Sequence, residues 1–324
     1  MGGSVRLRGV ARPARRTIAG GVIQQTAKGD IMRVQAFLPA VAPFDFSATL
    51  AFMRGFPALT GEQRTADESL VRAIREAGVV AVTRLSAAAG RSGLDCEIEA
   101  ATPVPEQAAV AIQRRLSFQF GLADELGEFY RLAAEDPAFA PVVRRLYGYH
   151  QVKFPSPLEL LCWAILSQRV PMAVARQAKR ALVEAAGNQV PWGPETLWAF
   201  PDEQQLQDFS EERLREITSN SRKASYLYRA VRQWSDTDEE FLRTGDFDAV
   251  RECLLSFPGI GPWSASFVLI RGLGRTEHMA PDKEGLRAAS RVYGHLVDEA
   301  EFTTLASRYG RWQGYWGHYL RVFG

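Results

Sequence analysis

The chain has 324 residues, of which 46% are hydrophobic and 23% charged, with a formal net charge of +2. This length accommodates two or three domains with a substantial core, and no apolar run is long enough to span a membrane, so we expect a soluble, cytoplasmic protein. The 3 cysteines and 4 histidines are scattered, which excludes a disulfide framework and the usual spacing of a zinc site.

The N-terminus is strongly basic. Residues 1–29 contain six Lys or Arg side chains and no acidic one, so the rest of the chain has 33 basic against 37 acidic residues. We predict that residues 1–31 form a basic, disordered extension. The alternatives are an arm that contacts nucleic acid and a start codon assigned too early, with Met32 as the true first residue.

Residues 32–122 mix strand and helix patterns. MRVQAFLPAV (32–41) reads as a strand, and residues 71–89 and 94–103 predict further strands around turns. FDFSATLAFMRGFPAL (44–59) begins with a cap and becomes helical, and residues 105–122 form an amphipathic helix with a proline near its start. We therefore predict a small, β-rich α+β domain followed by a different region.

After Leu122 the strand patterns stop. A series of segments with helical spacing, joined by short turns that contain Pro or Gly, fills residues 123–324. This part of the chain is therefore predicted to be all-α, with only short connections between its helices.

The stretch FPGIGPWSASFVLIRGLG (257–274) is the most informative part of the chain. Pro258 ends a helix because it lacks an N–H group and clashes with the preceding turn. Gly259 and Gly261 can adopt positive φ and bring bare backbone close to another surface, and Pro262 fits the first turn of a second helix. The pattern predicts a helix–hairpin–helix, and a plain turn between two helices is the alternative.

Such a hairpin suits a phosphate. The N–H groups of the second helix point outward at its positive end, so we expect a phosphate contact at four residues: Gly259, Gly261, Trp263 and Ser264. Backbone carbonyls before and within the hairpin, those of Leu255, Phe257 and Ile260, can hold a monovalent cation, Na⁺ or K⁺, that bridges to the same phosphate.

The phrase L-L-x-F-P-G-I-G-x-W-S-A-x-x-x-x-x-R-G resembles the helix–hairpin–helix DNA glycosylases, specifically the AlkA type of 3-methyladenine DNA glycosylase. Residues 42–56 and 77–85 are similar to the N-terminal domain of that group. Residues 155–182 resemble its segment with a DNA-wedging residue, and residues 308–324 resemble its closing helix. The resemblance covers nearly everything after Met32.

The resemblance implies both a fold and an activity. The fold is a β-rich domain over residues 32–122 and a helical core of two lobes over residues 123–324, with the active-site cleft between the lobes. The activity is that of a monofunctional glycosylase, which flips a modified base out of duplex DNA. The enzyme hydrolyses the N-glycosidic bond and leaves an abasic site. Alkylated purines are the default substrate, in base excision repair.

The resemblance implies few partners besides DNA. Catalysis needs no cofactor, and we expect a monomer on double-stranded DNA in the nucleoid, without a membrane or an obligate protein partner.

The catalytic carboxylate is expected in HMAPDKEGLRAAS (278–290). Counting from Pro258 places the family's aspartate on Lys283, and we predict that Asp282, one residue earlier, is the working carboxylate. Glu284 and an altered mechanism are the alternatives. Asp282 also suits a helix N-cap, a role compatible with catalysis.

Other positions of the chain match functional positions of the family, some with a different residue type. Trp263 stands where glycosylase–lyases have a Schiff-base lysine, so no strand cleavage is expected. Trp263 and Phe267 match pocket aromatics, although Phe267 could equally be a core residue. Gln168 and Arg169 match the intercalating pair, with an exposed turn arginine as the alternative.

Two departures bear on the substrate. Arg321 replaces a pocket tryptophan of the family, and with Lys283 it would repel a cationic alkylated purine. A second hypothesis is therefore a bulky neutral pyrimidine, such as glucosylated hydroxymethylcytosine in viral DNA, excised in antiphage defence. A third is a catalytically silent protein that binds lesions.

Overall fold

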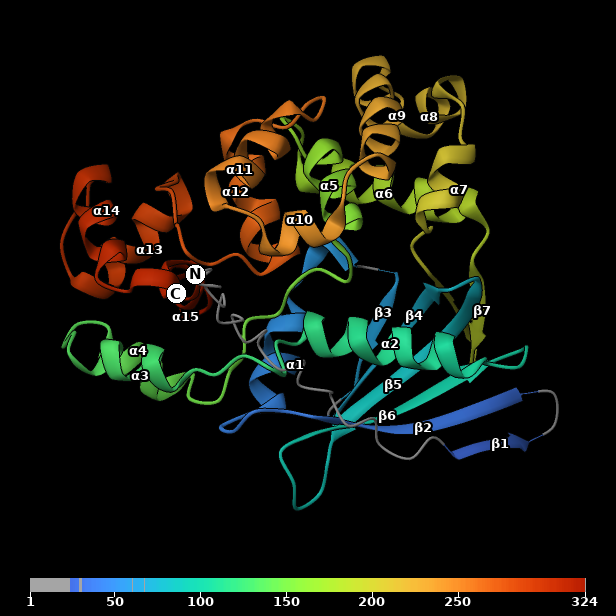
Figure 1. Ribbon diagram of the computed structural model, residues 1–324, viewed down its shortest axis with the longest axis horizontal. Helices are drawn as coiled ribbons and strands as arrows, with labels where there is room; N and C mark the ends of the chain where they lie inside the picture. Colours follow the sequence, from blue (N-terminus) through green and yellow to red (C-terminus); the bar gives the residue numbers. More distant parts are fainter. Residues whose placement is uncertain (1–23, 29–30, 60, 67, 324) are drawn as a thin grey trace, which may run out of the picture.

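The computed structural model describes residues 24–28, 31–59, 61–66 and 68–323 (Figure 1). A β-sheet with two covering helices forms one side of the molecule, and the remaining helices lie above the sheet or beside it (Figure 1). Within the described part of the chain, no helix is both long and apolar enough to cross a membrane. The mixed α+β architecture predicted from the sequence is confirmed.

The sheet is antiparallel and has the strand order β1-β2-β6-β5-β4-β3. Its strands are β1 (Gln24–Lys28), β2 (Ile31–Pro39), β3 (Gln63–Thr65), β4 (Ser69–Glu76), β5 (Val79–Ala87) and β6 (Gly93–Ala100).

The first strand corrects the predicted extent of the basic extension. Gln24 pairs with Gln35 and Lys28 with Ile31, so β1 adds an edge strand beside β2. The prediction that residues 1–31 are disordered is therefore wrong for residues 24–28 and for Ile31, because these residues pair in the strands β1 and β2. Residues 1–23 lie outside the described residues.

Two helices pack on the sheet. Helix α1 (Phe46–Arg54) begins at Asp45, whose carboxylate accepts from the Ser47 N–H at 2.8 Å, as the predicted cap requires. Helix α2 (Glu106–Gln119) lies across the sheet (Figure 1) and buries Ala108, Ile112 and Leu116 at helical spacing. A short 3₁₀ turn, η1 (Pro57–Leu59), follows α1 in the chain.

A hairpin in the middle of the helical region was not expected. Strands β7 (Gln189–Trp192) and β8 (Glu195–Trp198) pair around a Gly-Pro turn, and Leu197 packs with Val71 and Val82 against the sheet. The prediction that strands stop after Leu122 is therefore wrong. This hairpin also explains the uninterrupted burial within β4, which has neighbours on both faces.

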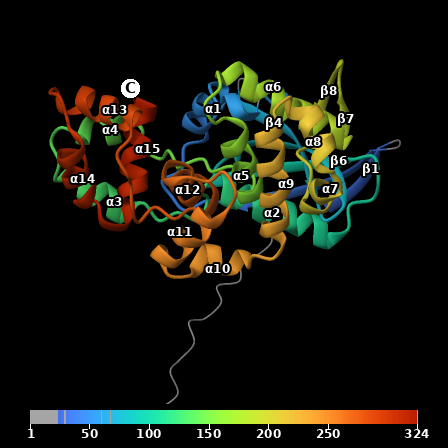
Figure 2. The ribbon, with the colours of Figure 1, turned by 90° about the horizontal axis from the view of Figure 1, so that it is seen from above.

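The other helices form two groups (Figures 1 and 2). One group contains α3 (Gly127–Ala134), α4 (Ala140–Arg145), α13 (Lys283–Tyr293), α14 (Glu299–Ser307), η3 (Gly310–Trp312) and α15 (Gln313–Phe323). The other contains α5 (Pro157–Leu166), α6 (Met172–Ala186), α7 (Glu203–Asp208), α8 (Glu211–Thr218), α9 (Ser221–Ser235), α10 (Glu239–Thr244), α11 (Phe247–Ser256), α12 (Pro262–Val268) and η2 (Leu269–Leu273), a π-helical turn.

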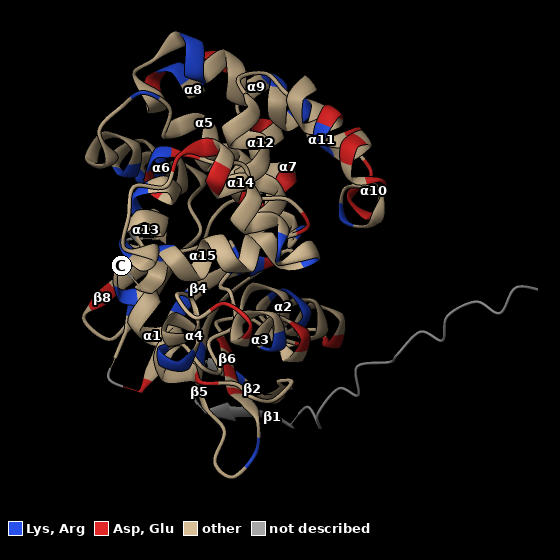
Figure 3. Cartoon of the chain, turned by 90° about the vertical axis from the view of Figure 1, so that its left-hand side faces the viewer, with Lys and Arg blue, Asp and Glu red and all other residues tan. Residues whose placement is uncertain are grey.

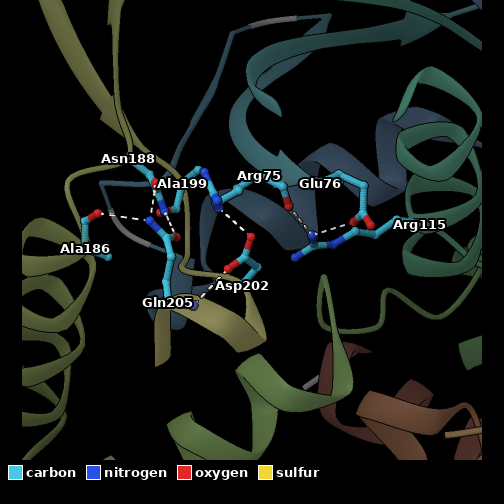
Figure 4. Close-up of polar contacts among 8 residues, drawn as sticks. All are labelled: Arg75, Glu76, Arg115, Ala186, Asn188, Ala199, Asp202 and Gln205. Carbon is cyan, nitrogen blue, oxygen red and sulfur yellow. Dashed lines mark hydrogen bonds and ion pairs between the residues drawn. The ribbon is translucent and has the colours of Figure 1, made fainter. Parts of the chain in front are cut away.

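Polar contacts join the sheet to the second group (Figure 4). Arg75 on β4 binds Asp202, which also caps α7, at 2.6 Å. Arg115 on α2 binds the Glu76 carboxylate at 2.9 Å and the Arg75 carbonyl at 2.8 Å. These contacts fix the sheet and α2 relative to α7.

A buried ionic cluster makes a second connection. Lys179 on α6 contacts Glu159 on α5 at 2.7 Å and Glu62, next to β3, at 2.5 Å. All three side chains are almost completely buried. Burial raises the pKa of Glu62 to about 7, although the neighbouring lysine opposes this shift.

Candidate active site

A cavity of about 1150 Å³ lies where the two helical groups meet. Its wall comprises the turn before α6, the hairpin with α12, the approach to α13, and one face of α15. The cavity is lined by all the predicted pocket and intercalating residues: Gln168, Arg169, Trp263, Phe267, Asp282, Lys283 and Arg321. Segments more than a hundred residues apart in the sequence thus contribute to one site.

Asp282 lies at the start of α13 with its carboxylate held on both oxygens. Oδ1 accepts from the Gly285 N–H at 2.7 Å, so the predicted N-cap is present. Arg321 Nη2 donates to Oδ1 and Oδ2 at 2.8 Å each, and the Trp263 indole N–H donates to Oδ2 at 3.0 Å. Four donated hydrogen bonds therefore fix the orientation of this carboxylate at the cavity wall.

These contacts keep Asp282 ionised. Burial by itself would raise the pKa of its carboxyl group, but the charge of Arg321 and the donors from Gly285, Arg321 and Trp263 outweigh burial and lower the pKa below its usual value. A fixed, charged carboxylate at a cavity wall can stabilise a positive charge that develops beside it.

The two predicted aromatics form a stacked pair. The rings of Trp263 and Phe267 are 5.2 Å apart with an interplanar angle of 29°. Phe267 also contacts Phe154 edge-on, at 5.8 Å, whereas Trp263 is 54% exposed. Phe267 therefore both packs against the interior and borders the cavity, and Trp263 presents an accessible ring to it.

The two positions that departed from the family pattern differ from each other. The guanidinium of Arg321 is bonded to Asp282, whereas Lys283 is exposed at the first position of α13. The positive charge of Arg321 is thus neutralised within the protein. Of the two charges that were expected to repel a cationic base, only that of Lys283 has no carboxylate bonded to it in the described part of the chain.

The hairpin between α11 and α12 confirms one glycine expectation and contradicts the other. Gly259 has φ of +83°, and a Cβ there would lie 2.5 Å from Tyr226 Cδ2, so only glycine fits without strain. Gly261 is extended, with φ of −102° and ψ of 180°, and nothing lies within 4 Å of a Cβ built on it. The positive φ predicted for Gly261 is therefore wrong, because the chain enters α12 in an extended conformation.

The turn before α6 is tied to this hairpin. Gln168 Nε2 donates to the Gly259 carbonyl, so the two loops on this side of the cavity are directly bonded. Arg169 is exposed and has φ of +51°, which is uncommon for a residue with a side chain. The hydrogen bond and the sharp turn together present Arg169 at the cavity rim.

Charges of both signs are spread over the helices (Figure 3), but the cavity wall is predominantly basic. The basic side chains on it outnumber the acidic ones: Arg169, Arg251, Arg271, Lys283 and Arg321 against Asp282 and Glu284. The positive charge that a polyanionic partner requires is therefore gathered here, although the body of the chain is acidic.

Sequence reasoning missed two polar residues of the cavity. His318 on α15 is buried and shares a hydrogen bond with the Tyr149 hydroxyl at 2.9 Å. Burial and three nearby cations hold the pKa of His318 well below its usual range, so its imidazole is neutral. Gln151 is fully buried in the extended segment before α5. No motif surrounds Gln151, so only the tertiary structure could reveal it.

Comparisons with known proteins show what the chain is similar to. No protein-family model matches the chain. The DNA-3-methyladenine glycosylase of Bacillus subtilis is 27% identical over 223 residues, which cover 67% of this chain and 74% of that protein. DNA-3-methyladenine glycosylase 2 of Escherichia coli is 23% identical over 274 residues, covering 84% and 92%. Over most of its length the chain is therefore similar to DNA-3-methyladenine glycosylases.

The fold of the chain agrees with a solved structure. The 3-methyladenine DNA glycosylase of Archaeoglobus fulgidus superposes with a TM-score of 0.74 at 24% identity, over 89% of this chain and 97% of the other. The match therefore spans the sheet and both helical groups. The two chains therefore share a fold.

Proposed function

We propose that the chain is a monofunctional DNA N-glycosylase that flips a modified base from duplex DNA into the cavity and hydrolyses its N-glycosidic bond. The product is an abasic site in an uncut strand, because Trp263 stands where a Schiff-base lysine would be needed for strand cleavage. Alkylated purines, for which the bacterial relatives are named, are the default substrate.

The ionised carboxylate of Asp282 carries this proposal. Bond cleavage builds positive charge on the sugar, and a fixed carboxylate stabilises that charge in a water-excluded site. Asp282 is held in one orientation by Arg321, Trp263 and Gly285 at the wall of the cavity. Glu284 is a weaker candidate, because it is exposed and bonded to Arg287 at 2.9 Å.

The other site residues take positioning roles in this proposal. The flipped base stacks against Trp263 and Phe267, and Arg169 enters the duplex where the base has left. Gln168 holds the Arg169 turn against the hairpin. The N–H groups at the start of α12, including that of Ser264, bind a phosphate of the same strand.

The test is base release followed by alkaline cleavage of the abasic site, in single-turnover assays on matched duplexes. One duplex contains an alkylated purine and another only normal bases. We expect release from the alkylated duplex and a loss of at least about 100-fold in Asp282→Asn, with DNA affinity retained. Equal release by wild type and Asp282→Asn would exclude this mechanism, and binding without any release would indicate a silent lesion-binding protein.

Asp298 offers a matched control. Its side chain caps α14 by accepting from the Glu301 N–H at 2.8 Å, in the same way as Asp282 caps α13. Asp298→Asn changes a cap without touching the cavity, so base release should stay within about twofold of wild type. A large loss in this variant would mean that capping rather than chemistry explains Asp282→Asn.

A bulky modified pyrimidine is a second candidate, favoured by the size of the cavity. About 1150 Å³ slightly exceeds the usual range for small-molecule pockets, roughly 300–1,000 Å³. A duplex with glucosylated hydroxymethylcytosine tests this candidate directly. Release from that duplex alone would favour a role in antiphage defence over repair.

A monovalent cation at the hairpin is also proposed. The residues fit a cation in part. The carbonyl oxygens of Leu255, Phe257 and Ile260 are neutral metal ligands, but that of Phe257 already accepts a hydrogen bond from the Ile260 N–H at 3.0 Å. A bound Na⁺ or K⁺ would supply positive charge for a phosphate. DNA affinity should then be higher in KCl or NaCl than in a tetraalkylammonium salt of equal ionic strength.

A further inference from the structure

The buried ammonium of Lys179 on α6 is bonded to three other segments of the chain at once. Its Nζ donates to the Ala58 carbonyl in η1 at 2.8 Å, to Glu62 before β3 at 2.5 Å and to Glu159 on α5 at 2.7 Å. Burial alone would lower the pKa of Lys179, but the charges of Glu159 and Glu62 outweigh burial and raise the pKa. The ammonium therefore stays charged and holds α6 against these three segments.

One of these bonds joins the two helices that flank the Arg169 turn. Helix α5 ends at Leu166 and α6 begins at Met172, so Glu159 and Lys179 each lie about two helical turns away from the connecting residues. The two helices and their turn thus form a helical hairpin that is bonded across, about 10 Å below its tip.

The turn at the tip needs support because its backbone conformation is unfavourable. Arg169 has φ of +51°, and a residue with a side chain keeps this conformation only where its surroundings hold it. The hydrogen bond from Gln168 to the Gly259 carbonyl holds the tip itself. The bond between Glu159 and Lys179 holds the helices on either side of the tip.

The ionic cluster is poorly arranged for stability alone. Glu62 Oε2 and Glu159 Oε2 are buried and have no hydrogen-bond partner among the described residues. A buried ion pair with unsatisfied atoms contributes little stability, and apolar side chains of similar volume often replace such a pair without loss. The ionic hydrogen bonds add a fixed orientation, because they have a defined length and direction that apolar contacts lack.

We propose that Glu159 and Lys179 are positioning residues that clamp the α5–α6 hairpin and present Arg169 at the angle at which it enters the duplex. This inference rests on the proposed glycosylase function, in which Arg169 fills the space that the flipped base leaves. Neither residue of the clamp is among the described residues that line the cavity. The clamp therefore acts on base flipping only through α5, α6 and the turn between them.

Two variants of the same cluster separate a clamp from a general structural role. Glu159→Met removes the bond across the hairpin, whereas Glu62→Met removes the other carboxylate of Lys179 and leaves that bond in place. Methionine suits both positions because it is flexible and unbranched, like glutamate. Each variant leaves Lys179 one carboxylate and removes one negative charge near Arg72, so effects of net charge are shared. Both variants should therefore lower the Tm to a similar extent.

Base flipping is measured with 2-aminopurine beside an alkylated purine in the duplex, because the fluorescence of 2-aminopurine rises when stacking is disrupted. We expect Glu159→Met to reduce this fluorescence change and single-turnover base release at least about 10-fold, since a small misplacement of a positioning group has such an effect. Glu62→Met should stay within about twofold of wild type. Affinity for an undamaged duplex should be equal in all three proteins, because the phosphate contact at α12 is unchanged.

Glu159→Gln keeps the experiment decisive if Glu159→Met fails to fold. Its amide oxygen still accepts from Lys179 but lacks the charge, so the bond across the hairpin is retained and weakened. Flipping and release should then fall about fivefold, whereas those of Glu62→Gln should match wild type. Equal values in these two variants would overturn the inference.

The outcomes separate this inference from the proposed function. An equal loss of release in Glu159→Met and Glu62→Met would show that the cluster is only structural, and unchanged flipping in Glu159→Met would overturn the inference as well. A wild type that releases no base would overturn the proposed function, and the fluorescence change, which needs no bond cleavage, would still decide the inference. A wild type that neither releases a base nor changes the fluorescence would overturn both.

Discussion

At the scale of single residues, the contact between Asp282 and Arg321 sets the charge state of the site. A catalytic carboxylate is useful only while it is ionised, and partial burial works against ionisation. Arg321 reverses that effect through a direct contact of 2.8 Å with both carboxylate oxygens. A residue that departs from the family pattern thus makes a contact that the sequence did not reveal, because it holds the Asp282 carboxylate in one orientation.

Arg321→Gln should shift the pH dependence of base release. In wild type, Asp282 has a lowered pKa, so it stays charged as the pH falls to its ordinary value of 3.8. Without the guanidinium, burial dominates and the pKa of Asp282 rises, so the acidic limb of the rate profile should move to higher pH. Single-turnover release from pH 4 to pH 8 measures this shift.

The control and the contrary result for this variant are specific. Arg287→Gln alters an arginine on the same helix that is bonded to Glu284, and its profile should match wild type. An acidic limb of Arg321→Gln that coincides with that of wild type would mean that Arg321 does not set the ionisation of Asp282.

At the scale of elements, the hairpin between α11 and α12 depends on one glycine. Gly259→Ala should destabilise the protein by about 1–3 kcal/mol, because the residue needs a positive φ and a Cβ would collide with Tyr226. DNA affinity should fall as well, since Gly259 also accepts from Gln168. Urea denaturation and a binding titration measure the two effects.

Gly261→Ala is the matched control. Its extended backbone and open surroundings predict that the unfolding free energy falls by only a few tenths of a kcal/mol. A small loss is expected because alanine is less favourable than glycine at an N-cap. If both variants lost similar stability, the distinction between a left-handed and an extended glycine in this turn would be wrong.

The buried ion pairs of Lys179 with Glu62 and Glu159 connect α6 to α5 and to the segment before β3. Two carboxylates share one ammonium in a buried site, and burial raises the pKa of Glu62 to about 7. The folded state therefore binds a proton that the unfolded state releases near pH 4.5. The stability contributed by this group is present below pH 4.5 and is lost as the pH rises through 7.

Glu62→Gln should remove that dependence, because an amide resembles the protonated carboxyl group. Relative to wild type, the variant should gain at least about 1 kcal/mol of unfolding free energy between pH 5 and pH 8. Urea denaturation at several pH values measures it, with Glu240→Gln on the exposed surface as control. A constant difference between Glu62→Gln and wild type at all pH values would place the pKa of Glu62 outside this window.

At the scale of the whole molecule, the β7–β8 hairpin extends from the helical region onto the sheet. Leu197 is completely buried there among residues of β4 and β5. Leu197→Ala should cost about 2–5 kcal/mol of unfolding free energy, from lost burial and the cavity left behind. Thr196→Ala, at the exposed neighbouring position, should change stability by less than about 0.5 kcal/mol. A loss in Leu197→Ala no larger than in Thr196→Ala would mean that the hairpin does not dock in solution.

Much of this architecture could be predicted locally. The alternation in residues 32–41 and the helical spacing of residues 105–122 correspond to β2 and α2, because each buries one face. Asp282 could be named as a cap from its position before a helical run, and a cap was expected at the start of residues 44–59, where the structure shows Asp45. The β7–β8 hairpin was missed although its Gly193-Pro194 turn is a local signal, because two four-residue strands leave a weak periodicity.

The sequence by itself determined the hairpin phrase, the α+β order of elements, and the residue types available for the site, since these depend on spacing along the chain. The tertiary structure decided what those residues contact. It alone placed Arg321 on Asp282 across 39 positions and bonded Arg271 to Val152, the neighbour of Gln151, beside the cavity. Such contacts arise from the packing of distant elements, and local periodicity contains no information about which side chains that packing leaves paired or unpaired.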